Sequence, residues 1–320
     1  MSERAQLDSR FPRRASCRLT DAPLESILDL GDQALTGVFP SNPVEDVCVT
    51  PLELAWCRKS GLVQLAHEYP GEMMYGQTYG YRSGLNASMV RHLETKVKKL
   101  ETELVELSDG DIVLDIGAND ATTLKAYQSS GIRRVGIDPS AEKFRRFYTD
   151  DIQLEVDFFS EEAYRRVADK PAKMITSIAM FYDLPDPAAF VRDIASVLDQ
   201  DGIWHFEQSY LPLMIRQLAY DTVCQEHLEY YTLQVVNNLL DAAGLKIVDF
   251  LGDRVRAFRA SGRDQTGIAL RTSVTRLECA ETRLASGPDT ARFGRRDGPT
   301  LRPICKIAVG EMRRFIRIVG

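Results

Sequence analysis

The segment Val113–Thr123 reads VLDIGANDATT, a short apolar run followed by one glycine and several polar side chains. This pattern predicts a buried strand that ends in a tight turn, because Gly117 lets the backbone approach a ligand without a Cβ. The helix expected next offers free N–H groups at its N-terminus, which can hold a carboxylate as well as a phosphate. The alternative is an ordinary strand–helix turn capped by Asn119 or Asp120.

Asp138 closes a second apolar segment, RRVGID, and stands 23 residues after Asp115. An acid at that place can accept hydrogen bonds from a ribose diol, as in dinucleotide-binding folds. Such folds carry G-x-G-x-x-G, whereas this turn reads GANDA with a single glycine. The turn therefore favours an amino acid joined to a nucleoside, and we predict S-adenosylmethionine. Asp115 and Asp120 are expected to meet its ammonium group or the atoms near its sulfonium, and Asn119, in the same turn, is expected to contact the cofactor as well.

Two further pairs of residues are candidates for the same pocket. Asp157 and Phe158 follow the third strand region, where the acid could bond the adenine amino group and the ring could pack on adenine. Met180 and Phe181 end the predicted strand Lys173–Phe181 and could wall the adenine or the methyl group. For Asp157 a plain loop position, and for Phe181 core packing, are equal alternatives.

From Asp111 onward, apolar strands alternate with helical stretches, which predicts a parallel sheet covered on both faces. The fold class is thus a doubly wound, Rossmann-like α/β domain. The predicted strands are Ile112–Ile116, Arg134–Asp138, Lys173–Phe181, Gly202–Glu207 and Leu245–Phe250, and the predicted helices are Thr122–Ser129, Ala141–Tyr148, Glu161–Ala168, Pro187–Leu198 and Leu233–Ala243. An amphipathic helix over Ser88–Leu107 is expected to lead into this domain.

Composition limits the partners and the compartment. The chain has 320 residues and a net charge of −6, so bulk attraction to nucleic acid is not expected. No apolar run reaches the roughly 18 residues that span a bilayer, and the charged N-terminus lacks the apolar core of a secretory signal. Six scattered cysteines predict a reducing, cytoplasmic location. The oligomeric state is left open.

Three segments are predicted: a small N-terminal domain over 1–74, the α/β domain over 75–253, and an atypical tail over 254–320. The tail holds 14 Arg and one Lys against six acidic residues, a net charge of +9. It is either an Arg-rich, loosely ordered extension or an out-of-frame or truncated end. Its aromatic side chains are too few to stack on nucleic acid bases.

VLDIGANDATT resembles the VLDIGSNDGT motif of sugar C-methyltransferases, which methylate carbon on nucleotide-linked keto-sugars. The resemblance continues, in order, through YGYRSGLNASM, SIAMFYDLPDP, GIWHFEQSYLP and YDTVCQEHLEYY, and covers about residues 15–250. It implies an N-terminal zinc-binding domain, a central class I methyltransferase domain and a C-terminal substrate domain. It also implies that part of the YGYRS stretch, including Tyr79, folds over the cofactor.

The resemblance further implies a reaction through an enolate. A ketone makes the neighbouring C–H acidic, so the enzyme needs a general base near that carbon and a donor for the enolate oxygen. His227 is the implied base, with Glu226 orienting it. The side chains of Tyr230, Tyr231 and Gln225 could donate to the sugar or the enolate.

Three departures from the family pattern stand out. The two C-x-x-C pairs of its zinc site read Cys17-Arg18-Leu19-Thr20 and Cys57-Arg58-Lys59-Ser60. A structural zinc is held by four closed ligands, so we expect no metal, and buried thiols at Cys17 and Cys57; zinc held there is the alternative. In addition, Gln225 replaces the first His of a His-Glu-His motif, and the tail does not match a substrate domain.

An NAD-dependent enzyme and a non-catalytic cofactor-binding remnant are the rival functions.

Overall fold

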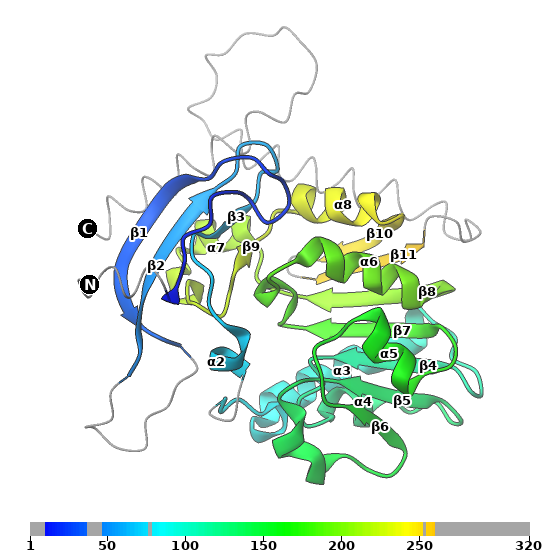
Figure 1. The fold of residues 1–320 in the computed structure, drawn as a ribbon. Coiled ribbons are helices and arrows are strands. Elements are labelled where there is room, and N and C mark those ends of the chain that lie inside the picture. Colours follow the sequence, from blue (N-terminus) through cyan, green and yellow to red (C-terminus); the bar gives the residue numbers. More distant parts are fainter. Residues whose placement is uncertain (1–9, 37–46, 76–78, 252–253, 260–320) are drawn as a thin grey trace, which may run out of the picture.

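Two β-sheets organise the chain. The computed structural model describes residues 10–36, 47–75, 79–251 and 254–259. Within these residues, a four-stranded sheet built mainly from the N-terminal segment lies beside a seven-stranded sheet from the rest of the chain (Figure 1). Each sheet has an apolar core of its own, and buried residues of the first segment also join the core of the second.

The larger sheet confirms the predicted doubly wound fold. Its order is β10-β11-β8-β7-β4-β5-β6, and its strands pair in parallel except β11, which is antiparallel to both neighbours. All five side chains of β4 are buried, as expected for a strand covered on both faces. The strands are β4 (Ile112–Ile116), β5 (Arg133–Ile137), β6 (Ile152–Glu155), β7 (Ala172–Ile178), β8 (Leu198–Glu207), β10 (Leu245–Leu251) and β11 (Arg254–Arg259).

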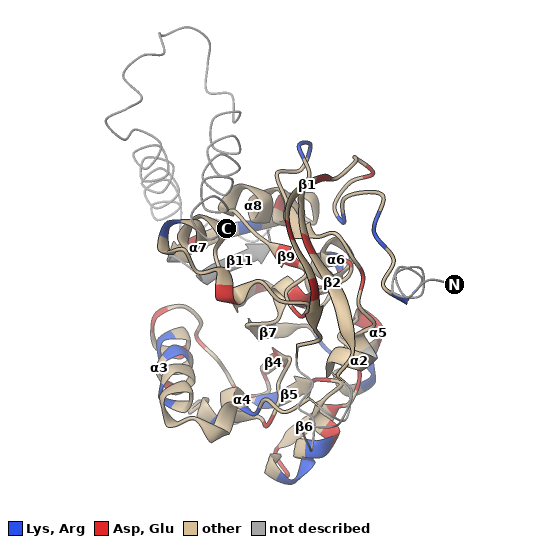
Figure 2. Ribbon diagram, turned by 90° about the vertical axis from the view of Figure 1, so that its left-hand side faces the viewer, with Lys and Arg blue, Asp and Glu red and all other residues tan. Residues whose placement is uncertain are grey.

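Helices cover both faces of this sheet. In Figure 2, α3 and α4 lie on one side and α5 and α6 on the other, where α8 also packs against α6. The caps follow local chemistry: Asp186 accepts a hydrogen bond from Ala189 N at the start of α6, with Pro187 in the first turn. The helices are α3 (Ala87–Glu103), α4 (Thr122–Ala126), η2 (Ala141–Phe147), α5 (Glu161–Val167), η3 (Phe181–Asp183), α6 (Pro187–Val197), α7 (Leu211–Gln217), η4 (Tyr220–Thr222) and α8 (Leu233–Ala242). Among the described residues, no helix combines the length and the hydropathy needed to cross a bilayer.

The smaller sheet has the order β1-β2-β3-β9 and is antiparallel throughout. Its first three strands are β1 (Glu25–Ala34), β2 (Val49–Trp56) and β3 (Val63–Leu65), followed by α2 (Gly71–Tyr75) and η1 (Ser83–Leu85). The fourth, β9 (Glu229–Tyr230), comes from far along the chain and pairs with β3. The segment that carries the predicted base is therefore fixed to the N-terminal domain.

One predicted boundary is wrong. The α/β domain was expected to end at residue 253, but β11 inserts between β8 and β10 and so extends the sheet to Arg259. This strand, β11, is antiparallel to its neighbours and rich in arginine. Its sequence therefore lacks the apolar run that marks the parallel strands. The rest of the predicted tail, residues 260–320, lies outside the described residues.

Candidate active site

The turn after β4 lies where the strand order reverses, between β4 and β7. Ligands of doubly wound sheets bind at the carboxyl edge of the strands at this point. Gly117 has φ +72°, which favours glycine, and a Cβ there would lie 3.4 Å from Cγ of Met180. The structure thus brings the turn and Met180 together at one edge of the sheet.

Asp138 lies directly beside this turn at the end of β5. Its Oδ2 accepts a hydrogen bond from Asn119 N at 2.7 Å, and its Oδ1 accepts one from Ser140 N at 2.6 Å. The carboxylate is buried. It therefore shapes the turn, and its remaining lone pairs are available to a ligand diol.

The polar side chains of the turn fasten the YGYRS stretch over it. Asn119 Oδ1 accepts from Ser83 N at 3.0 Å, and Asp120 Oδ2 accepts from Gly84 N at 3.0 Å. Asp120 also forms an ion pair with Arg82 at 3.4 Å. The sequence predicted that both side chains would contact the cofactor; the structure gives them partners within the chain, so they build the wall of the site.

Asp115 has a partner inside the sheet. Its Oδ1 accepts a hydrogen bond from Thr176 Oγ1 on β7 at 2.5 Å, and the side chain is buried. Burial raises its pKa to about 7, although the hydrogen bond from Thr176 acts in the opposite direction. Asp115 thus ties the end of β4, just before the turn, to the neighbouring strand β7.

The residues predicted to surround adenine differ in their exposure. Asp157 is exposed and forms an ion pair with Arg166 at 2.5 Å, while Phe158 is an exposed ring whose edge lies near Gly71 of α2. Phe181 is buried in the core, where it stacks on Tyr231 with ring centroids 5.2 Å apart. The core-packing alternative therefore describes Phe181, because η3 turns its ring inward.

His227 is the predicted base, and its ring is held from one side. Nδ1 lies 2.7 Å from the carbonyl oxygen of Thr222. A carbonyl can only accept, so Nδ1 carries the hydrogen and Nε2 keeps the lone pair. The ring also packs on Tyr182 at a centroid distance of 4.2 Å. Burial lowers the pKa of His227, which favours the neutral ring that a general base requires.

The other residues of this motif differ from expectation. Glu226 is half-buried, and burial raises its pKa, but the atom that orients His227 is the Thr222 carbonyl. Tyr230 lies in the core of the smaller sheet and Tyr231 in that of the larger one. Packing therefore replaces the predicted donor roles of these two tyrosines, because Tyr230, at the end of β9, and Tyr231, which follows it, enter the cores of different sheets.

Gln225 is likewise a structural residue. Its Oε1 accepts from Thr36 Oγ1 at 3.1 Å, and its Nε2 donates to Thr50 Oγ1 at 3.0 Å. The side chain is 1% exposed. Its amide is satisfied inside the N-terminal domain and does not point toward a substrate.

Asp183 is a candidate site residue that the sequence did not predict, and it lies against Tyr75. The carboxyl group of Asp183, on η3, interacts with the hydroxyl of Tyr75 on α2, and burial raises both pKa values well above their usual range. The ring of Tyr79 meets that of Tyr75 edge to face at 5.6 Å. Asp183 could have been predicted from its position shortly after β7, since the position of Asp138 directly after β5 made that residue a candidate.

Tyr79 links the two halves of the site. The carboxyl groups of Glu226, Asp183 and Asp138 all act on its hydroxyl, and burial raises its pKa. Its carbonyl oxygen accepts a hydrogen bond from Lys143 Nζ at 2.6 Å. Tyr79 therefore interacts electrostatically both with Glu226, the neighbour of the predicted base in the chain, and with Asp138, the predicted ribose-binding acid.

Two family models match parts of this chain. The family model "Methyltransferase domain" matches residues 89–249, half of the chain, and the model "Putative zinc binding domain" matches residues 17–75. A curated relative, C-methyltransferase NovU of Streptomyces niveus, is 26% identical over 201 residues, which cover 62% of this chain. The match covers 47% of that relative, so the chain spans about half of its length.

Solved structures of low identity were also found. Magnesium protoporphyrin IX methyltransferase (ChlM) from Synechocystis PCC 6803 is 13% identical with a TM-score of 0.39, over 57% of this chain and 90% of its own. An O-methyltransferase family protein from Burkholderia thailandensis is 14% identical with a TM-score of 0.41, over 55% and 58%. The family match, in contrast, runs continuously from α3 to β10 across the larger sheet. On that ground the chain belongs to the methyltransferase domain family.

Proposed function

We propose that this chain is an S-adenosylmethionine-dependent C-methyltransferase that acts on a nucleotide-linked keto-sugar or a similar small molecule. The observation that carries the proposal is the 2.7 Å contact between His227 Nδ1 and the Thr222 carbonyl, which leaves Nε2 free as a base. The likeness to a C-methyltransferase supports the choice of carbon as the acceptor. A cytoplasmic location belongs to the proposal and is supported by the free cysteines among the described residues.

The cofactor would lie against the turn after β4. Asp138 would accept hydrogen bonds from its ribose hydroxyls, and Gly117, Met180 and Tyr79 would surround the remainder. The bound sulfonium supplies an activated methyl group, so the chain needs no nucleophile of its own. Asn119 and Asp120 contribute by holding residues 81–84 over the site.

The acceptor carbon becomes nucleophilic when a proton leaves it. Nε2 of His227 would take that proton from the carbon beside the ketone, and the electron pair would delocalise onto the ketone oxygen as an enolate. Protonated hydroxyls of Tyr75 and Tyr79 are suited to donate to this oxygen, since burial raises their pKa values. The enolate carbon then attacks the methyl group in line with the departing sulfur.

Transfer of labelled methyl to a nucleotide 4-keto-sugar tests the whole proposal. We expect His227→Ala to lower the rate by at least about a hundredfold, a usual contribution of a general base, while the affinity for S-adenosylmethionine by calorimetry stays unchanged. Tyr231→Phe, which removes a core hydroxyl, should keep the rate within about threefold, because packing is preserved. Equal turnover in the wild type and His227→Ala would remove His227 from the mechanism.

Two further measurements separate the rivals. Exchange of the acidic C–H into heavy water, without cofactor, isolates the base and should depend on His227. Binding of S-adenosylmethionine without exchange or transfer would instead indicate a cofactor-binding protein, and tight binding of NAD in place of S-adenosylmethionine would indicate an NAD-dependent enzyme.

A further inference from the structure

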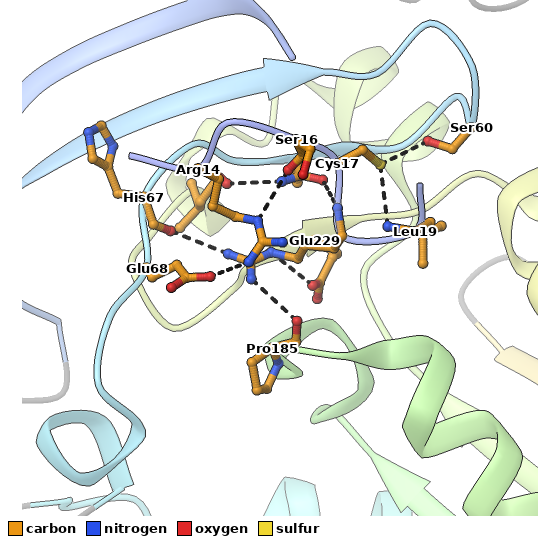
Figure 3. Close-up of polar contacts among 12 residues, drawn as sticks. Arg14, Ser16, Cys17, Leu19, Ser60, His67, Glu68, Pro185 and Glu229 are labelled. Carbon is orange, nitrogen blue, oxygen red and sulfur yellow. Dashed lines mark hydrogen bonds and ion pairs between the residues drawn. The ribbon is translucent and has the colours of Figure 1, made fainter. Parts of the chain in front are cut away.

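Two short turns of the N-terminal domain face each other across a buried junction. The first carries Cys17 and Thr20, and the second carries Cys57 and Ser60; Figure 3 shows Cys17 directed at Ser60. Both turns lie within the match to the zinc-binding domain model. The fold thus implies a metal at this junction, and the side chains present can be tested against that requirement.

The backbone of both turns is closed by its own hydrogen bonds. Thr20 N donates to the carbonyl of Cys17 at 3.3 Å, and Gly61 N donates to the carbonyl of Cys57 at 2.9 Å. Leu19 N also donates to the sulfur of Cys17 at 3.4 Å. The backbone thereby directs the side chains of Cys17 and Thr20, and those of Cys57 and Ser60, toward one common point.

At that point the side chains bond to one another. Cys17 Sγ lies 3.2 Å from Ser60 Oγ, and Cys57 Sγ lies 3.6 Å from Thr20 Oγ1. Each thiol of one turn therefore meets the hydroxyl of the other. Both sulfur atoms belong to buried side chains in the apolar core of the larger sheet.

The hydroxyls have a defined hydrogen-bonding role. Thr20 Oγ1 accepts from Ala22 N at 3.4 Å, and Ser60 Oγ accepts from Leu62 N at 3.2 Å. Each hydroxyl accepts a hydrogen bond from the backbone through its oxygen, and its hydrogen can donate to the sulfur of the other turn. The two turns are in this way joined by thiol–hydroxyl contacts.

This donor set does not fit a structural zinc. Such sites use four thiolate or imidazole ligands, whereas two of the four groups here are neutral hydroxyls. Within the part of the chain that the structure describes, no group of three or more His, Cys, Asp or Glu side chains is arranged to hold a metal ion. In a zinc-binding domain, the bound metal contributes to the free energy of folding. Here, other contacts must hold the two turns together.

We propose that this junction is a metal-independent joint, in which two crossed thiol–hydroxyl contacts and apolar packing replace the metal. The turn backbones keep the arrangement of a four-ligand site. Two substitutions, Thr20→Cys and Ser60→Cys, are therefore sufficient to convert the joint into a zinc site. The proposal concerns the N-terminal domain alone and does not depend on the catalytic function.

Metal analysis and thermal unfolding of the full chain test it. The wild type, purified with zinc present, should hold well under about 0.2 zinc per chain, and a chelator should leave its Tm unchanged. The double variant Thr20→Cys, Ser60→Cys should hold about one zinc, as a site of four cysteine thiolates does, and its Tm should fall on chelation. A wild type that holds one zinc and loses Tm with the chelator would overturn the proposal, as would a folded double variant that holds none.

Variants that retain side-chain size test the contacts without any metal. Thr20→Val and Ser60→Ala should each lower Tm by a few degrees, whether or not zinc is present, and Thr20→Ser should recover most of the loss. Thr102→Val, which alters an exposed threonine on α3, serves as the matched control and should leave Tm within about one degree. If Thr20→Val and Ser60→Ala behave like this control, the crossed contacts do not hold the joint and the proposal fails. These measurements decide the matter even if the double variant does not fold.

Discussion

Arg18 Nε lies 3.2 Å from Glu229 Oε1, and the two side chains are 1% and 0% exposed (Figure 3). The guanidinium also donates to the carbonyl oxygens of His67 at 3.3 Å and Pro185 at 3.4 Å. Glu229 belongs to β9, two residues after His227, and Pro185 follows η3 closely. One arginine of the N-terminal domain thus joins both segments that carry the candidate catalytic residues.

Breaking this pair should be costly. Burial raises the pKa of Glu229 and lowers that of Arg18, while each charge favours the other. Arg18→Ala would strand a buried carboxyl group, and we expect it to lower the free energy of unfolding by about 3–5 kcal/mol in urea. The double variant Arg18→Ala, Glu229→Ala should lose less than the sum of the two single losses.

Arg58→Ala is the matched control, because Arg58 pairs with Glu25 at 2.6 Å but is 65% exposed. It should cost at most about 1 kcal/mol. Similar losses for Arg18→Ala and Arg58→Ala would show that burial of the Arg18–Glu229 pair has no special consequence.

The pH dependence of methyl transfer should report on His227. Its ring must be neutral to act as a base, and burial lowers its pKa below the usual 6.5, while the Thr222 carbonyl acts in the opposite direction. Transfer should therefore be full at neutral pH and fall as the pH drops through a value below 6.5. A plot of kcat/KM against pH measures this, and an acid limb centred at or above 6.5 would contradict it.

Gly84→Ala should loosen the wall over the cofactor turn. A Cβ at this position would lie 2.5 Å from Asp120 Oδ2 and 3.1 Å from Thr122 Oγ1. Because the Asp120 carboxylate is buried and bonded, residues 81–84 would have to move away. We expect a loss of about 1–3 kcal/mol in stability and roughly tenfold weaker binding of S-adenosylmethionine by calorimetry, equal to about 1.4 kcal/mol.

Gly71→Ala provides the comparison, since its Cβ would meet the ring of Phe158 at 3.5 Å, an ordinary contact. It should leave the affinity for S-adenosylmethionine within about twofold, because no neighbour has to move. Equal affinity in Gly84→Ala and the wild type would mean that residues 81–84 take no part in the cofactor site.

Asp115 should make stability depend on pH. Its pKa is raised to about 7 in the folded chain, against about 3.9 when unfolded. The folded state holds the proton more tightly, so this contribution is full below about pH 4 and is lost as the pH rises to about 7. The loss amounts to roughly 4 kcal/mol at most, at about 1.4 kcal/mol per pKa unit.

Urea unfolding of Asp115→Asn between pH 4 and pH 8 measures this term. The decline in the variant should be shallower than in the wild type, because the Asp115 contribution is removed while those of Asp183 and Glu229 remain; Asp201→Asn, at an exposed acid, should retain the full decline. Parallel profiles for the wild type and Asp115→Asn would contradict the raised pKa.

Local patterns predicted much of the larger sheet. β4 begins and ends at the predicted residues, and α6 and α8 each end one residue before their predicted ends. Buried parallel strands are short apolar runs, and the helices between them have apolar residues at helical spacing, so both are visible in the sequence. The predicted strands did not include β1, β2, β3, β6, β9 and β11. Two of these, β9 and β11, are paired with β3 and β8, which lie far away in the chain, so local patterns do not reveal them.

The candidate site divides in the same way. The glycine turn and Asp138 could be proposed from residue type and position along the chain, and His227 from the resemblance to sugar C-methyltransferases. The orientations of Gln225, Phe181 and Tyr231 could not, since each is set by which core its side chain enters. Asp183 and Tyr75 are brought together by η3 and α2, which lie more than a hundred residues apart.

The sequence by itself determined the class of fold and the family of this chain, because a strand, a one-glycine turn and a following acid are local features that neighbouring residues dictate. Only the tertiary structure decided which polar groups face a ligand and which serve the chain. Asn119 and Asp120 hold residues 81–84, and Thr222 rather than Glu226 orients His227. The physical reason is that a hydrogen bond is made with whichever partner the fold brings within about 3 Å, and that proximity depends on long-range packing.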